Sequence, residues 1–191
     1  CKIVGALIAA GGTGKSYFAI HMAIALAAGI SLFKKFEPLE AKHVVYISGE
    51  DSIDELHRRL YWATRHLPEQ VKERVGKNIS FIDLADAYEL FTHKKNHSDV
   101  EITEVVKNLI GSIQAKSLPN LGLIIIDPVS RFRGGEENLA QDTTRFVQAL
   151  QVFRDQLSVS VLALHHVNKG ARFNGTGQNN ARGSSAFVDG V

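Results

Sequence analysis

The chain contains very little cysteine: Cys1 is the only one among its 191 residues. This excludes an internal disulfide and a zinc site made of four cysteines. Little net charge is present either, since 22 basic residues face 20 acidic ones. Any contact with nucleic acid must therefore come from a local basic patch rather than from bulk charge. No apolar run is long enough to span a bilayer, so we expect a cytoplasmic protein without a membrane partner.

Length and composition are those of one ordinary globular domain. Hydrophobic residues make up 45% of the chain and charged residues 22%, and 191 residues are enough for one α/β core. The sequence opens without Met inside an apolar strand-like run and stops inside another apolar segment. We therefore predict a single domain over residues 1–191 that is a fragment of a longer protein, truncated at both ends.

Apolar runs alternate with segments of helical periodicity along the chain. Such alternation predicts βαβ crossovers, a mainly parallel central sheet and flanking helices, which is an α/β fold. We expect a polar surface loop over residues 89–99. The expected strands cover residues 3–8, 43–48, 79–84, 121–127 and 159–164, and the expected helices cover residues 16–28, 53–66, 68–75, 100–114 and 142–157.

A glycine-rich turn between the first strand and the first helix predicts a phosphate-binding loop. The turn reads Gly11-Gly12-Thr13-Gly14-Lys15-Ser16. Its backbone N–H groups would surround an anion, and the helix N-terminus would add its dipole. Lys15 would reach the β- and γ-phosphates of a nucleotide, and the Ser16 hydroxyl would bind Mg²⁺. Ala9 replaces the first glycine of the strict pattern, which is acceptable if this residue keeps a negative φ.

Carboxylates end two further strands of the predicted sheet. Asp127 follows the most apolar strand and would hold the Mg²⁺ water shell opposite Ser16, unless it only begins a turn with Pro128. Glu50 ends a strand that we expect beside the first strand, where a carboxylate can activate water for attack on a γ-phosphate. Asp51 is the rival for this role, and it can instead cap the next helix.

Two adjacent histidines, His165 and His166, end the last apolar strand. A histidine near the γ-phosphate could hydrogen-bond to it and report hydrolysis to the following loop. Adjacent side chains point to opposite faces of a strand, so only one of the two can serve. The competing interpretation is a histidine that simply satisfies its own hydrogen bonds in the core or at the surface.

Basic residues gather in the loops after the last two strand ends. These loops contain glycine and suit either a nucleic-acid backbone or a neighbouring subunit's nucleotide, although solubilising charge is an equally open reading for each residue. The residues concerned are Arg131, Arg133, Lys169, Arg172 and Arg182.

Taken in order, five motifs of the chain resemble those of the RecA-like P-loop ATPases. The similarity is greatest to plasmid RepA-type hexameric replicative DNA helicases, which are relatives of the DnaB-like helicases, and it covers nearly all of the chain. The motifs are Gly11-Gly12-Thr13-Gly14-Lys15-Ser16, Tyr46-Ile47-Ser48-Gly49-Glu50-Asp51, Leu123 to Pro128, Leu164-His165-His166-Val167-Asn168-Lys169-Gly170 and Ala181-Arg182-Gly183-Ser184-Ser185.

The resemblance implies a RecA-like fold, ATP and Mg²⁺ as cofactors, and a hexameric ring around single-stranded DNA. It implies that Glu50 is the catalytic carboxylate, that Asp127 is the Walker B aspartate, and that His166 rather than His165 senses the γ-phosphate. Arg182 matches the position of an arginine finger that acts on the neighbouring subunit. The loops over residues 131–138 and 169–181 would face the DNA channel, with Arg131, Arg133, Lys169 and Arg172 as DNA contacts.

Three functions stay open at this point. The first is a ring-forming DNA helicase that replicates a plasmid or other mobile element. The second is a recombination or repair ATPase that forms filaments on DNA without unwinding it. The third is a P-loop kinase for a small molecule, which would need no water-activating carboxylate at Glu50.

Overall fold

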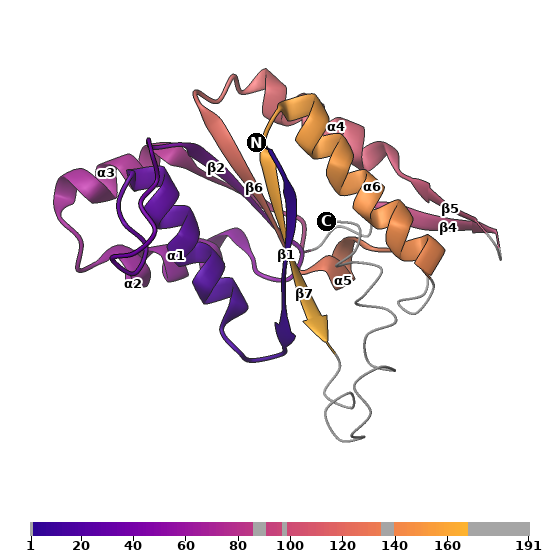
Figure 1. Cartoon of the computed structure of the whole chain (residues 1–191), viewed down its shortest axis with the longest axis horizontal. Coiled ribbons are helices and arrows are strands. Elements are labelled where there is room, and N and C mark those ends of the chain that lie inside the picture. Colours follow the sequence, from indigo (N-terminus) through magenta and orange to yellow (C-terminus); the bar gives the residue numbers. More distant parts are fainter. Residues whose placement is uncertain (1, 86–90, 97–98, 135–139, 168–191) are drawn as a thin grey trace.

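The computed structural model describes residues 2–85, 91–96, 99–134 and 140–167, and Figure 1 shows a central sheet with helices on both sides. In chain order the elements are β1 (Val4–Ala10), α1 (Lys15–Ala28), β2 (His43–Ser48), α2 (Ile53–Thr64), α3 (Glu69–Asn78), β3 (Ile79–Asp83), β4 (Thr92–Asn96), β5 (Asp99–Ile102), α4 (Glu104–Ala115), β6 (Leu121–Asp127), α5 (Val129–Phe132), α6 (Ala140–Leu157) and β7 (Ser160–Val167).

The main sheet has five strands in the order β1-β7-β6-β2-β3, and every pairing within it is parallel. The predicted α/β class, with a mainly parallel sheet flanked by helices, is confirmed. Parallel strands place all their carboxyl ends at one edge, where ligands of open α/β sheets bind. The loop after β1, the residues after β2 and β6, and the last residues of β7 therefore meet at that edge.

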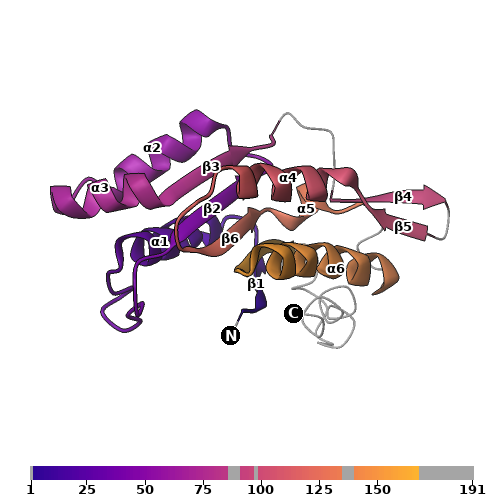
Figure 2. The ribbon, with the colours of Figure 1, turned by 90° about the horizontal axis from the view of Figure 1, so that it is seen from above.

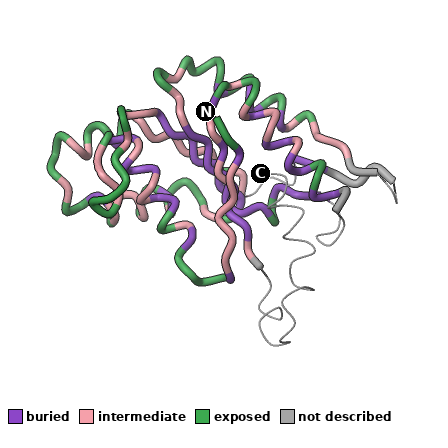
Figure 3. Tube along the Cα trace, viewed as in Figure 1, coloured by how far each residue is buried: buried purple, intermediate pink, exposed green. Residues whose placement is uncertain are grey.

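Alternate residues of each strand feed two separate hydrophobic cores. Tyr46 and Ile125 pack with α1, α2 and α3 on one face, whereas Ile47 and Ile126 pack with α4, α5 and α6 on the other. Figure 2 shows these two helical layers on either side of the sheet. All six residues of β2 are buried, as expected of a strand covered on both faces, and Figure 3 shows the buried residues concentrated in the strands.

The strand order corrects one prediction. The strand that ends at Glu50 does not lie beside β1, because β7 and β6 stand between them. Successive strands are neighbours in most sheets but not in all, and the pairing of parallel strands depends on contacts far apart in sequence. In this sheet β2 pairs with β6 from His43 to Ser48, which places Ser48 opposite Asp127.

The prediction of a loop over residues 89–99 and a helix from residue 100 is also wrong. β4 and β5 form an antiparallel pair there, and α4 begins only at Glu104 after Thr103. The pair is anchored by Phe91, which is fully buried and stacks on Phe132 with 4.7 Å between ring centroids. Thr92 is also fully buried, and its hydroxyl accepts a hydrogen bond from the Gly134 N–H. These tertiary contacts override the polar composition of the segment.

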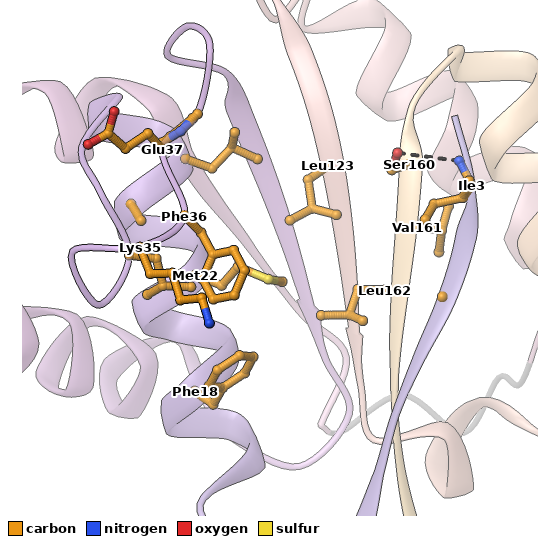
Figure 4. A pocket seen from close by; sticks show the side chains of 15 residues that line it. Ile3, Phe18, Met22, Lys35, Phe36, Glu37, Leu123, Ser160, Val161 and Leu162 are labelled. Carbon is orange, nitrogen blue, oxygen red and sulfur yellow. Dashed lines mark hydrogen bonds between the residues drawn. The ribbon is translucent and has the colours of Figure 1, made fainter. Parts of the chain in front are cut away.

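A cavity of about 750 Å³ lies between α1, the loop before β2 and the strands β6 and β7. Its walls are mainly apolar and include Phe18, Met22, Phe36, Leu123 and Leu162, which Figure 4 labels. None of the described loop residues 11–14 lines this cavity, so it is distinct from the predicted phosphate site. In the helices that the structure describes, no stretch combines the length and hydropathy needed to cross a bilayer.

Candidate functional site

The loop between β1 and α1 has the backbone that an anion site requires. Gly12 and Gly14 adopt φ values of 75° and 85°, which side-chain-bearing residues rarely take. Residues 11–14 are exposed and precede the helix N-terminus, where N–H groups lack partners within the helix. Ala9 lies within the extended strand β1 and is not among the residues with positive φ, which meets the condition for replacing the first glycine.

Lys15 is folded back onto the strand that precedes it. Its Nζ donates hydrogen bonds to the carbonyl oxygens of Ala9 and Ala10, both at 2.8 Å, and only 5% of the residue is exposed. Burial lowers the pKa of the Lys15 ammonium, while the nearby Asp127 carboxylate opposes that shift. A phosphate in the loop would therefore compete with two carbonyls for an ammonium already in place.

Asp127 ends β6 in a buried position, with 5% of its surface exposed. The Tyr46 hydroxyl donates a hydrogen bond of 2.5 Å to Asp127 Oδ2. Burial, with the charge of Asp127 as the second cause, raises the pKa of the Tyr46 phenol well above its usual range. The phenol therefore stays protonated and acts as a donor to the carboxylate.

Glu50 follows β2 and is presented at the surface near the same edge. The Gly49 N–H donates to the Asp127 carbonyl oxygen at 2.8 Å, which ties the residue before Glu50 to the end of β6. The Glu50 Oε1 lies 3.6 Å from Arg131 Nε, and both side chains are more than half exposed. The structure thus brings together a predicted catalytic carboxylate and a predicted DNA contact, two residues that the sequence treats separately.

Asp51 is engaged elsewhere. Arg59 on α2 donates to both carboxylate oxygens of Asp51, at 2.5 and 2.8 Å, and also to Glu55 at 2.7 Å. Burial raises the pKa of Asp51, and the Arg59 charge opposes the shift. The Arg59 guanidinium lies 5.6 Å from the ring centroid of Tyr17 on α1. Arg59 therefore connects the end of β2 to the start of α1 and engages Asp51, and the choice of Glu50 as the base stays a prediction.

The two histidines occupy opposite faces of β7, as alternation requires. His165 is 4% exposed, whereas His166 is half-buried on the same face as α1. A Cβ placed on Gly11 would stand 3.9 Å from His166 Nδ1. His166 therefore lies beside the phosphate loop, and its sensor role stays a prediction.

The predicted DNA contacts do not all fit. Arg131 is exposed on α5, but Arg133, which directly follows α5, is only 9% exposed. Arg133 is therefore withdrawn as a surface contact for DNA. The remaining predicted contacts, Lys169 and Arg172, and the predicted arginine finger, Arg182, lie outside the described residues.

Comparison with known protein families matches residues 2–172 to the AAA domain. The chain belongs to this family of P-loop ATPases. The match covers most of the chain and spans Lys15, Glu50, Asp127 and His166. Membership of the AAA domain family supports nucleotide binding and ATP hydrolysis at a general level, in agreement with the phosphate loop and the strand-end residues described above.

Sequence reasoning missed Tyr46 and Arg59 in this AAA domain. Tyr46 carries one of the few polar side chains in the apolar strand β2, and a buried tyrosine hydroxyl usually finds a partner. The sequence therefore indicated that Tyr46 needs a partner but could not identify that partner, because Asp127 is 81 residues away. Arg59 gave no signal, because arginine is common on exposed helix faces.

Gly49 sets how closely α5 approaches the end of β2. A Cβ on Gly49 would lie 2.6 Å from Arg131 Cβ and 2.9 Å from Phe132 Cζ, so a side chain must displace α5. We expect Gly49→Ala to lower the free energy of unfolding by about 1–3 kcal/mol in urea denaturation. The control is Gly76→Ala, on the exposed side of α3 with open space around it, which should raise stability by about 0.5–1 kcal/mol. Equal stability of the two variants would contradict the close contact.

Proposed function

We propose that this AAA domain is the motor of a ring-forming replicative DNA helicase of a plasmid or other mobile element, with Mg²⁺-dependent ATP hydrolysis coupled to single-stranded DNA. The observation that carries the proposal is the meeting of four features at one sheet edge: the phosphate loop, Asp127, Glu50 and His166. Exposed Arg131 stands beside Glu50, 3.6 Å away, where it can connect a DNA phosphate with the hydrolytic carboxylate.

In the proposed reaction, a water oxygen bonds to the γ-phosphorus while the bond from that phosphorus to the β–γ bridging oxygen breaks. Glu50 orients the water and takes its proton, and ADP and phosphate leave. Lys15 and the loop N–H groups hold the negative charge that develops on the phosphate oxygens. His166 donates a hydrogen bond to the γ-phosphate and so registers its presence.

The donor set suits Mg²⁺ shared with the nucleotide. Ser16 offers a hydroxyl and Asp127 a buried carboxylate, which are the oxygen ligands that Mg²⁺ prefers. Within the described ranges, no cluster of three or more His, Cys, Asp or Glu could enclose an ion by itself. This fits an ion that takes its other ligands from phosphates and water. When bound, Mg²⁺ would neutralise charge on the β- and γ-phosphates.

The assembly completes the proposal. In this proposal Arg182 acts on the nucleotide of the neighbouring subunit, and Lys169 and Arg172 bind DNA in the channel of a hexamer. These roles rest on the family resemblance alone, because the three residues lie outside the described residues.

The deciding experiment measures ATP hydrolysis by the full-length protein with and without single-stranded DNA, followed by strand displacement on a forked duplex. Strong stimulation with displacement supports the helicase. Stimulation without displacement favours the recombination or repair ATPase. Hydrolysis that DNA leaves unchanged contradicts the proposed coupling and favours a switch or a small-molecule kinase.

Arg131 gives a sharper test of the coupling. We expect Arg131→Gln to abolish stimulation by DNA and to reduce the slope of log affinity against log salt concentration by about 1, because one phosphate contact is lost. The matched control is Lys107→Gln, which removes one exposed, ion-paired positive charge on α4. DNA stimulation that survives in Arg131→Gln as it does in the control would place the DNA contact elsewhere.

A further inference from the structure

The hydrogen bond from Tyr46 to Asp127 stands out among the contacts at this edge because both groups are buried. Tyr46 is fully buried, Asp127 is 5% exposed, and the two oxygens lie 2.5 Å apart. A hydrogen bond to a charged acceptor is stronger than one between neutral groups, and burial strengthens it further. The carboxylate of Asp127 therefore has one oxygen fixed by the protein itself.

Core packing holds the Tyr46 ring in position. β2 pairs with β6 on one side and with β3 on the other, so Tyr46 stands between Ile125 and Phe81. The ring meets Phe81 edge to face, with 5.9 Å between centroids, and it belongs to the same core as Ile20 and Ala23 of α1. The hydroxyl is thereby fixed relative to α1, whose first turn carries Lys15 and Ser16.

The bond has a direct consequence for the other carboxylate oxygen. A carboxylate held at Oδ2 can no longer rotate freely, so Oδ1 is presented in one orientation. Removing a group that orients a metal-binding side chain in this way typically lowers metal affinity by about 10- to 100-fold. Packing in the core needs only the ring of Tyr46, because phenylalanine would fill the same space. The hydroxyl is therefore needed only for its bond to Asp127.

We propose that Tyr46 is a positioning residue for the metal-nucleotide complex: its hydroxyl orients Asp127 toward the Mg²⁺ that accompanies ATP. This inference rests on the proposed function, because it assumes a metal shared between Asp127 and the nucleotide. Tyr46 touches neither nucleotide nor metal and acts only through the carboxylate of Asp127.

The test compares nucleotide affinity with and without metal in Tyr46→Phe, which keeps the ring and removes the hydroxyl. Binding of a fluorescent ATP analogue is titrated in Mg²⁺ and in EDTA, and bound Mn²⁺ is counted by electron paramagnetic resonance. We expect the affinity for the metal-nucleotide complex to fall by about 10- to 100-fold while metal-free binding stays unchanged. Tyr61→Phe, at an exposed tyrosine of α2, is the matched control and should bind as the wild type does.

Four outcomes would overturn the inference. Unchanged metal-nucleotide binding in Tyr46→Phe removes the positioning role, and an equal loss with and without metal indicates only a structural role. If adding Tyr46→Phe to Asp127→Asn lowers the affinity for the metal-nucleotide complex further, Tyr46 does not act through Asp127. If the affinity falls no further, the inference is supported. If the wild type itself binds nucleotide without any effect of metal, the proposed function fails together with this inference.

Discussion

Replacing Glu50 with glutamine is expected to leave ATP binding intact and to slow hydrolysis by about 100- to 10,000-fold. The amide is similar in size to the carboxylate but cannot accept the proton of the attacking water. Glu50 is more than half exposed, and it pairs at 3.6 Å with Arg131, whose side chain is also more than half exposed, so replacing Glu50 does not break this pair in the core. ATP affinity is measured by equilibrium titration, and hydrolysis by phosphate release under single-turnover conditions.

The neighbouring residue provides the matched control for this prediction. Asp51→Asn removes a carboxylate one position away, but one that Arg59 holds through two hydrogen bonds. Its loss should lower the free energy of unfolding because Arg59 is left partly unpaired, while the chemical step slows far less than in Glu50→Gln. If Asp51→Asn instead stops hydrolysis in a folded, ATP-binding protein and Glu50→Gln does not, the base is Asp51.

The second large effect is expected from Lys15→Ala, which should weaken ATP binding by about 30-fold or more. That figure corresponds to the loss of at least about 2 kcal/mol from a buried, charge-assisted contact with phosphate. Folding should survive, because burial lowers the pKa of the Lys15 ammonium and so disfavours its charge, which offsets part of the loss of its two hydrogen bonds to backbone carbonyls.

Thermal unfolding measures this effect directly. Nucleotide that binds only the folded state raises the midpoint of unfolding, by an amount that depends on its concentration relative to Kd. We expect ATP to raise the midpoint in the wild type and in Lys35→Ala, a control at a lysine in the exposed loop before β2, and not in Lys15→Ala. An ATP-dependent shift of normal size in Lys15→Ala would show that phosphate is bound elsewhere.

The local elements of the site each depend on a short stretch of sequence. The phosphate loop needs only an apolar strand, glycines at the two left-handed positions and a helix that follows, all within residues 4–28. Capping works over the same short range, and Ser52 accepts a hydrogen bond from the Glu55 N–H at the start of α2. The carboxyl ends of parallel strands share one edge, so the meeting of Glu50, Asp127 and His166 near the phosphate loop was also predictable.

Only the tertiary structure decided the relations between strands. The order β1-β7-β6-β2-β3 depends on pairings between residues up to 157 positions apart, and no local pattern encodes them. The same holds for the hairpin of β4 and β5, where buried Phe91 and Thr92 fix a segment that reads as a polar loop. Arg133 was predicted as a surface contact because it lies in a basic segment, but in the folded protein it is only 9% exposed.

Long-range contacts also assign partners to the site residues. The sequence by itself determined that a phosphate loop, two acidic strand ends and a histidine belong to this protein, because each depends on its nearest neighbours in the chain. The tertiary structure alone decided that Tyr46 holds Asp127, that Arg59 occupies Asp51 and that Arg131 faces Glu50. Side chains from different strands and helices acquire these partners only when the packed sheet brings them within hydrogen-bonding or ion-pairing distance.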